Sequence, residues 1–243
     1  MSLETIKVDA LEISPGDTVL DLGCGEGRHT ISTYLLHEAR VYGVDLRHQD
    51  LTTASRRLQE ICPADDATPT AAAHAIQFAV ANGHQLPFAD DSFDVVVCSE
   101  VLEHIIDYHS VLGEIQRVLK PSGQLAVSVP RFFPEWVCWR LSREYHEVEG
   151  GHVRIFRTGE LKRTIEGFSF EFTHRHWAHS LHVPYWWLRC LQWRGGEEAP
   201  LARWYHKLLV WDLLQRPWLT RLLDRLLNPI MGKSVVLYFK PQS

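Results

Sequence analysis

Short apolar runs alternate with stretches of helical periodicity through the first 130 residues. The runs are rich in Val, Ile, Leu and Phe, and they predict strands at 17–22, 41–46, 75–82, 93–99 and 124–130. The stretches between them predict helices at 28–38, 48–61 and 107–119. Because unbroken apolar strands require burial on both faces, the pattern predicts a mostly parallel sheet covered on both sides, which is the α/β doubly wound class.

The remainder of the chain departs from this alternation. Strands are expected at 168–178 and 234–241, which brings the predicted sheet to seven strands. The segments 131–150 and 179–232 do not belong to a minimal sheet and are expected to be mainly helical insertions. We therefore expect residues 1–243 to form a single domain, with these insertions near its C-terminus. The Ala-, Asp-, Thr- and Pro-rich stretch 62–73 predicts a mobile loop.

Composition narrows the classes of function. The formal net charge of −5 and the pI near 6.3 give no global attraction to nucleic acid, so no nucleic-acid partner is expected. The five cysteines are odd in number and widely spaced, which favours reduced thiols and a cytoplasmic location. The sequence offers neither a leader pattern nor an apolar run of about 18 residues, so secretion and membrane spanning are not expected.

A glycine cluster, GCGEG, follows the first predicted strand. Gly23 and Gly25 lie where a parallel sheet brings backbone amides to a ligand, and Asp45 ends the next strand, where a carboxylate can accept from ribose hydroxyls. The dinucleotide-binding pattern would place a third glycine at position 28, which is Arg28 here. The cluster therefore favours a nucleotide-type ligand and disfavours a dinucleotide dehydrogenase.

Four sequence motifs carry a family resemblance. VLDLGCGEGRHT, the acid in VYGVDL, the segment ANGHQLPFADDSFDVVVCSEVLEHI and the run RVLKPSGQLAVSVP resemble, in order and spacing, the class I S-adenosylmethionine-dependent methyltransferases. The similarity is greatest to the small-molecule branch that includes the ubiquinone and menaquinone methyltransferases. It covers residues 11–130 strongly and continues weakly to about 178. It implies a Rossmann-like sheet and S-adenosyl-L-methionine as cofactor, with S-adenosyl-L-homocysteine as product.

The resemblance also implies which residues bind the cofactor. They lie on the glycine turn and at the following strand ends: Asp21, Gly23, Gly25, Asp45, Asn82, Gly83 and Cys98. The first three would shape the loop around the methionine end, and Asp45 would bind the ribose hydroxyls. Asn82 stands where relatives usually carry an Asp that accepts from the adenine amino group, and an amide oxygen can do the same without charge.

Methyl transfer from a sulfonium is an in-line displacement that needs no nucleophilic side chain, although an oxygen acceptor can require a general base. The catalytic residues are thus not defined by the sequence. His104, in VLEHI beside Glu103, and His152, after two glycines, are weak candidates, and a packing role is the alternative for His104. Histidines at 174, 176, 179 and 182 suggest a metal, but no Cys or carboxylate cluster completes a site, so none is expected.

Tryptophan is concentrated late in the chain, with six of its nine residues between 186 and 218. The segments 184–193 and 203–227 combine Trp and Leu with Lys and Arg. They could form a lid or internal core, a peripheral membrane contact, or a homodimer face through 184–227. The segment 136–148 is consistent with an amphipathic helix that caps a substrate pocket, or with ordinary surface packing.

These observations favour methyl transfer to a small, lipophilic or aromatic acceptor, because large rings supply contact area with few polar demands. The alternative is a non-catalytic module that keeps the cofactor site and docks on a membrane or partner through its Trp-rich tail. The expected location is cytoplasmic, with peripheral membrane contact left open.

Overall fold

The computed structural model describes residues 4–62, 74–148, 150–193, 199–215 and 217–242, and it contains one seven-stranded sheet. The order is β3-β2-β1-β4-β5-β7-β6, with β7 antiparallel to both of its neighbours and the other pairs parallel. The strands are β1 Thr18–Leu22, β2 Arg40–Asp45, β3 Ala75–Val80, β4 Phe93–Ser99, β5 Leu119–Pro130, β6 Phe170–Ala178 and β7 Ser234–Pro241. The doubly wound, mostly parallel Rossmann-like sheet predicted from the sequence is confirmed.

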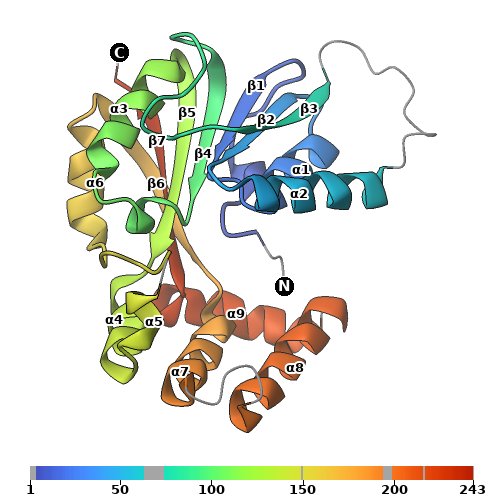
Figure 1. Ribbon diagram of the computed structural model, residues 1–243, viewed down its shortest axis with the longest axis vertical. Helices are drawn as coiled ribbons and strands as arrows, with labels where there is room; N and C mark the ends of the chain where they lie inside the picture. The colour runs from blue at the N-terminus through green and yellow to red at the C-terminus, as the bar shows by residue number, and fades with distance from the viewer. Residues whose placement is uncertain (1–3, 63–73, 149, 194–198, 216, 243) are drawn as a thin grey trace.

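The helices form two layers on the sheet and a third group beyond it (Figure 1). The α-helices are α1 Arg28–Leu36, α2 His48–Ile61, α3 Tyr108–Val118, α4 Phe132–Leu141, α5 Glu144–Glu147, α6 Thr158–Glu166, α7 Val183–Leu191, α8 Pro200–Gln215 and α9 Trp218–Met231. Short 3₁₀ helices are η1 Val8–Ala10, η3 Leu102–His104 and η4 Ser180–His182. α3 and α6 cover one face of the sheet, and α1 and α2 lie against the other.

Each central strand buries side chains on both faces. Leu20 and Leu22 of β1 pack in the core beneath α3 and α6, whereas Val19 between them packs on the opposite side. This alternation explains why the runs are apolar throughout, since neither face of the sheet reaches water.

Several boundaries differ from those expected. The strand predicted at 124–130 begins at Leu119, which pairs with Phe93 before the register shifts. Lys120 accounts for part of this extension, because its Nζ bonds both carboxylate oxygens of Asp94 on β4 at 2.8 Å. The helix expected at 136–148 is divided into α4 and α5 by Ser142, whose backbone is extended and whose hydroxyl donates to Glu144.

The third group of helices, α4, α5, α7, α8 and α9, lies beyond the carboxyl ends of the parallel strands (Figure 1). We call it the helical layer. α4 follows β5 directly and packs on α7, α7 packs on α8, and α9 runs beside η4 and β6. The mainly helical character predicted for 131–150 and 179–232 is confirmed for their described residues. The layer therefore stands at the edge of the sheet where ligands of this architecture bind.

Two sequence expectations concern the rest of the chain. The loop expected at 62–73 lies, from residue 63 onward, outside the described residues. Across the described helices, none combines the length and apolarity needed to cross a bilayer.

Arg117 on α3 fixes the loop that leads into β4. Its guanidinium donates to the carbonyl oxygens of Leu86 and Phe88 at 3.1 and 2.8 Å, and it makes two bonds to the Glu114 carboxylate at 2.8 Å. Glu114 in turn accepts from the Leu86 amide at 2.6 Å. One side chain thus satisfies two backbone carbonyls, and a second satisfies an amide of the same loop.

We predict that Arg117→Met lowers the free energy of unfolding by about 1–3 kcal/mol, because both carbonyls and Glu114 lose their partner. Urea denaturation measures the change. As a control, Lys240→Met removes an exposed ion pair with Glu12 and should cost less than about 1 kcal/mol. Equal costs for the two variants would show that the Arg117 network does not hold the loop.

Candidate functional site

The glycine turn between β1 and α1 is tied to the end of β2. The amides of Gly23 and Cys24 both donate to the Val44 carbonyl oxygen, at 2.8 and 3.0 Å. Gly23 has φ +70°, and a Cβ there would lie 2.3 Å from the Val101 side chain. Gly25 has φ +53°, and a Cβ on it would meet nothing within 4 Å. Glycine is therefore favoured at both positions by conformation, and at Gly23 by space as well.

Asp45 is held in place by two backbone amides. Its Oδ2 accepts from Gly25 at 2.8 Å and its Oδ1 accepts from Arg47 at 2.9 Å. Each carboxylate oxygen has a second lone pair, so the group can still accept hydrogen bonds from a ligand. The acid is thus fixed beside the turn in an orientation that two ribose hydroxyls can use.

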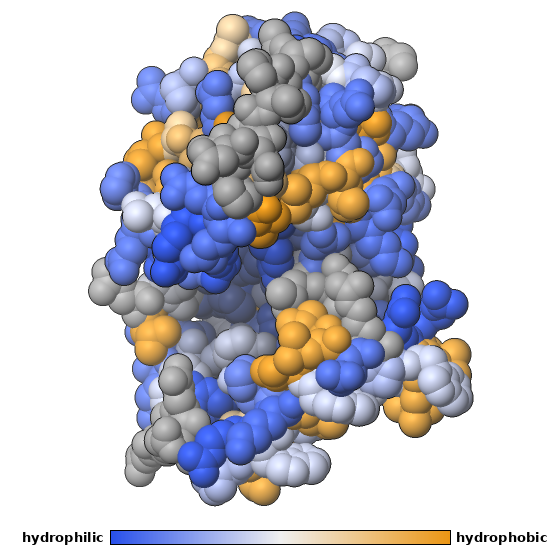
Figure 2. Space-filling view, turned by 90° about the vertical axis from the view of Figure 1, so that its right-hand side faces the viewer, coloured by the Kyte–Doolittle hydropathy of each residue, from blue (hydrophilic) through white to orange (hydrophobic). Residues whose placement is uncertain are grey.

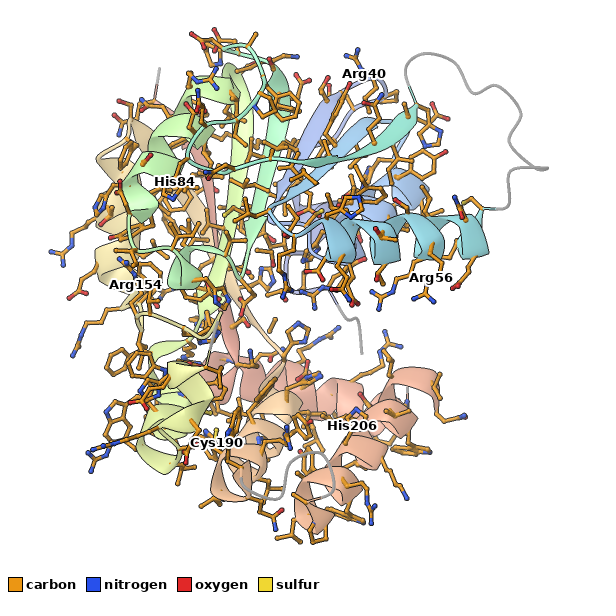
Figure 3. The ribbon with its side chains drawn as sticks, viewed as in Figure 1. Arg40, Arg56, His84, Arg154, Cys190 and His206 are labelled. Carbon is orange, nitrogen blue, oxygen red and sulfur yellow. The ribbon has the colours of Figure 1, made fainter. Side chains whose placement is uncertain are left out.

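The residues predicted to border the adenine follow β3. The Asn82 side-chain oxygen accepts from the His84 amide at 3.0 Å, which closes a short turn through Gly83. The same oxygen keeps a second lone pair and the amide NH₂ keeps its donors, so Asn82 can serve a purine edge. Figure 3 labels His84 on the α3 side of the molecule.

One pocket of about 540 Å³ joins these elements. Of the predicted site residues, those lining it are Gly23, Gly25, Asp45, Asn82, Gly83 and His104. Its wall also includes Glu100, Val101 and Ile105 from the segment after β4. The pocket therefore runs from the glycine turn to the end of the fourth strand. Figure 2 shows the surface hollowed between the sheet half of the molecule and the helical layer.

Asp21 and Cys98 are not among the described residues that line this pocket. Asp21 is buried and accepts from the Thr30 hydroxyl at 2.6 Å, which braces the start of α1 against β1. Burial raises the pKa of Asp21 to about 6, although that hydrogen bond opposes the shift. Cys98 has no exposed surface and packs in the core beneath α3. Their side chains support the strands that carry the pocket, and direct cofactor contact by either stays a prediction.

Beyond the predicted cofactor-binding residues, the pocket reaches a cluster of acids and histidines. Glu100, at the end of β4, adopts a left-handed backbone conformation with φ +57°. Its carboxylate accepts from Ser128 at 3.0 Å and lies 3.9 Å from the Lys233 ammonium. The 3₁₀ turn η3 then buries Glu103 and leaves His104 exposed.

A distant segment, residues 150–154, completes the cluster. Val153 donates its amide to the Glu103 carbonyl oxygen at 2.9 Å, and Arg154 bonds the Ile105 carbonyl at 2.8 Å while its guanidinium lies over the Tyr108 ring. These contacts bring the His152 ring within 4.8 Å of the His104 ring, centroid to centroid. The two weak candidates from the sequence are therefore neighbours, although 48 positions separate them.

Both imidazole rings are oriented through Nδ1. His152 Nδ1 lies 2.6 Å from Oε1 of Glu135 on α4, and His104 Nδ1 lies 3.3 Å from the Gly151 carbonyl oxygen. Because both partners are acceptors, each Nδ1 donates, and each Nε2 of a neutral ring keeps a free lone pair. Glu135 also accepts from Trp139 and Tyr145, at 3.0 and 3.1 Å.

The two buried carboxylates respond differently to their surroundings. Burial alone would raise the pKa of Glu135, but the hydrogen bond and charge of His152, with Lys233 nearby, outweigh it and lower that pKa. Burial, reinforced by the charge of Glu100, raises the pKa of Glu103 well above its usual range. Burial and the neighbouring charge of His152 lower the pKa of His104. Glu135 thus favours a charged state, which lets it hold His152.

Sequence reasoning missed Glu135. The signal was an acid within the aromatic run FFPEWVCW, where a side chain facing the core must find partners. The histidines at 174 and 176, by contrast, lie on the other side of the sheet from this cluster. His174 stacks on Tyr238 with ring centroids 4.1 Å apart, and His176 Nε2 lies 3.1 Å from the Thr5 carbonyl oxygen.

Comparison with known proteins agrees with this geometry. A family model described as "Methyltransferase domain" matches residues 20–127. An uncharacterised 37.1 kDa protein in a transposon of Streptomyces fradiae is 33% identical over 171 residues, 68% of this chain and 45% of that protein. Demethylmenaquinone methyltransferase of Listeria welshimeri is 34% identical over 125 residues, 51% of this chain and 48% of that enzyme. The chain spans less than half the length of these relatives.

The fold comparison extends over nearly the whole chain. The crystal structure of a putative methyltransferase from Bacillus halodurans aligns with a TM-score of 0.65 at 16% identity, covering 97% of each chain. That similarity supports the fold alone. The match over residues 20–127 includes the glycine turn and Asp45, and this part of the chain is a class I S-adenosylmethionine-dependent methyltransferase domain.

Proposed function

We propose that this chain transfers a methyl group from S-adenosyl-L-methionine to a small, lipophilic acceptor. The observation that carries the proposal is the single pocket that connects the glycine turn and Asp45 to Glu100 and His104. Such a pocket can hold a methyl donor at one end and admit a nucleophile at the other.

The residues of the pocket fit the donor. Asp45, fixed by the Gly25 and Arg47 amides, is proposed to accept from the ribose hydroxyls, and Asn82 and Gly83 to border the adenine. The open space at Gly25 lets the ligand approach the backbone of the turn. The donor supplies a methyl group on a sulfonium, which leaves as a thioether while the acceptor atom forms the new bond to carbon.

Aromatic residues of the helical layer pack beside the histidine cluster and are proposed to border the acceptor. The Tyr145 ring lies 5.8 Å from the His152 ring and 5.9 Å from both the Trp186 and Trp193 rings. Lys233, which approaches Glu100, lies over the Trp186 ring at 5.5 Å from its centroid. We call Tyr145, Trp186 and Trp193 the aromatic wall. Large rings next to a polar cluster favour an acceptor with an apolar or aromatic body and one polar reacting group. In this proposal residues 131–150 and 179–232 belong to one domain with the sheet and form the acceptor side.

Incubation with methyl-labelled S-adenosylmethionine and a lipid extract, followed by mass spectrometry, tests the proposal. We expect a product heavier by one methyl group with the native chain and none with heat-denatured protein. Tight cofactor binding with no methyl transfer to any extract component would instead favour the non-catalytic binding module.

We predict that Asp45→Ala weakens binding of S-adenosylhomocysteine by about tenfold to a hundredfold, because a charged acceptor of two hydrogen bonds is lost. Isothermal titration calorimetry measures the affinity. The control Glu171→Gln changes an exposed acid on β6 and should leave binding unchanged. Unchanged affinity in Asp45→Ala would contradict the proposed contact between Asp45 and the ribose hydroxyls.

The helical layer exposes an apolar stripe that this pocket does not use. On α9 the exposed side chains include Trp218, Leu222, Leu226 and Ile230, one helical turn apart, and none of its described residues is buried. Between positions 189 and 225 the sequence carries seven Lys or Arg against four Asp or Glu. We propose that the stripe docks on an anionic membrane surface, since an apolar face flanked by cations suits that interface. Figure 2 shows apolar surface on the helical layer, on the side of the molecule drawn there.

We predict that Leu222→Glu with Leu226→Glu reduces binding to vesicles containing phosphatidylserine by about tenfold or more, because two apolar contacts are replaced by charges repelled by the lipid. Vesicle flotation measures it. Leu36→Glu, an exposed leucine on α1, is the matched control. If the double variant floats with the vesicles as the native chain does, the membrane proposal is overturned. A shift of this variant to a smaller species in size-exclusion chromatography would then favour a homodimer face.

A further inference from the structure

We propose that Glu103, His104 and His152 bind a divalent first-row transition-metal ion at the acceptor end of the pocket. One ligand atom from each residue lies within 4.8 Å of the other two. The ion's role in presenting the acceptor's oxygen rests on the proposed methyl transfer, whereas binding of the ion itself does not.

Glu103 is the first observation that points to a ligand. Its side chain is 1% exposed, and neither carboxyl oxygen has a hydrogen-bond partner among the described residues. Leaving a buried carboxyl group without partners is costly, and buried polar groups in folded proteins are nearly always satisfied. A cation bound here would give both oxygens a partner.

The two histidines are prepared as metal ligands. A ligating imidazole usually donates its other N–H to a carboxylate or a backbone carbonyl, which fixes the ring and its tautomer. His152 has the Glu135 carboxylate in that position, at 2.6 Å, and His104 has the Gly151 carbonyl, at 3.3 Å. In each ring Nε2 is the nitrogen left to bind an ion.

The spacing allows closure on one ion. Ligand atoms bound to a single ion at 2.0–2.2 Å lie roughly 3.3 Å apart, so the three ligand atoms must draw together by up to about 1.5 Å. The Val153–Glu103 backbone hydrogen bond keeps the two segments in register, and His104 is exposed.

The surrounding charges and donors indicate which ion fits. The carboxylates of Glu100 and Glu135 lie near Glu103 and attract a cation, and Lys233 lies beside them. Two imidazoles with one carboxylate suit Zn²⁺, Mn²⁺, Co²⁺ or Fe²⁺ better than Mg²⁺ or Ca²⁺, which prefer oxygen ligands. Three protein ligands leave positions open, and His104 and Glu100 border the pocket. An oxygen of the acceptor can occupy an open position beside the methyl donor.

The test is titration of metal-free protein with Co²⁺ alone, followed by calorimetry and by the visible d–d absorption of the bound ion. We expect one ion per chain, bound at least about tenfold more weakly in Glu103→Gln, His104→Ala and His152→Ala. Glu135→Gln should weaken binding by about tenfold to a hundredfold, because it disturbs the partner of His152 rather than a ligand. His174→Ala, on β6, is the matched control and should bind as the native chain does.

The folding control is urea denaturation of every variant. His104→Ala replaces an exposed side chain. No saturable Co²⁺ binding by folded native chain, or equal binding in native chain and His104→Ala, would overturn the metal site. Loss of Co²⁺ binding in His174→Ala would place the bound ion at β6 and would also overturn the proposed site. Methyl transfer that survives complete chelation would remove the ion's role in the reaction, whereas Co²⁺ binding without any methyl transfer would contradict only the proposed function.

Discussion

The attachment of the glycine turn to the end of β2 is the constraint on which the rest of the pocket depends. Val44 receives two amides of the turn through its carbonyl, and Asp45 receives a third through its side chain. These bonds join the turn after β1 to the carboxyl end of β2. They also fix the Asp45 carboxylate beside the pocket. The other residues of the pocket, from Asn82 to His104, face this turn across the same cavity.

The acceptor end is assembled differently, from segments that are remote in sequence. A turn after β4 supplies Glu103 and His104, the residues after Gly150 supply His152, and α4 supplies Glu135. Backbone bonds and the Arg154 guanidinium join the first two segments, and the carboxylate–imidazole contact joins the third. The helical layer is thereby coupled to the sheet through polar groups at the point where chemistry is proposed. The aromatic wall continues outward from it.

The sequence allowed the fold and the cofactor side to be predicted because both depend on local patterns. Apolar runs define the strands, and a turn that needs positive φ at Gly23 and Gly25 leaves a glycine signature. The acceptor side carries no such signature. Nothing in the spacing of positions 103, 135 and 152 requires them to meet. The histidines of β6 suggest a metal from the sequence because they share a strand face, which is a local pattern.

The central claim is that one pocket holds the donor at the glycine turn and delivers its methyl group toward His104. A crystal structure of the chain with S-adenosylhomocysteine tests this most directly. The account predicts ribose hydroxyls on Asp45, adenine beside Asn82, and the sulfur facing the side of the pocket bordered by Glu100 and His104. A ligand bound elsewhere, or one whose sulfur faces away from His104, would contradict it.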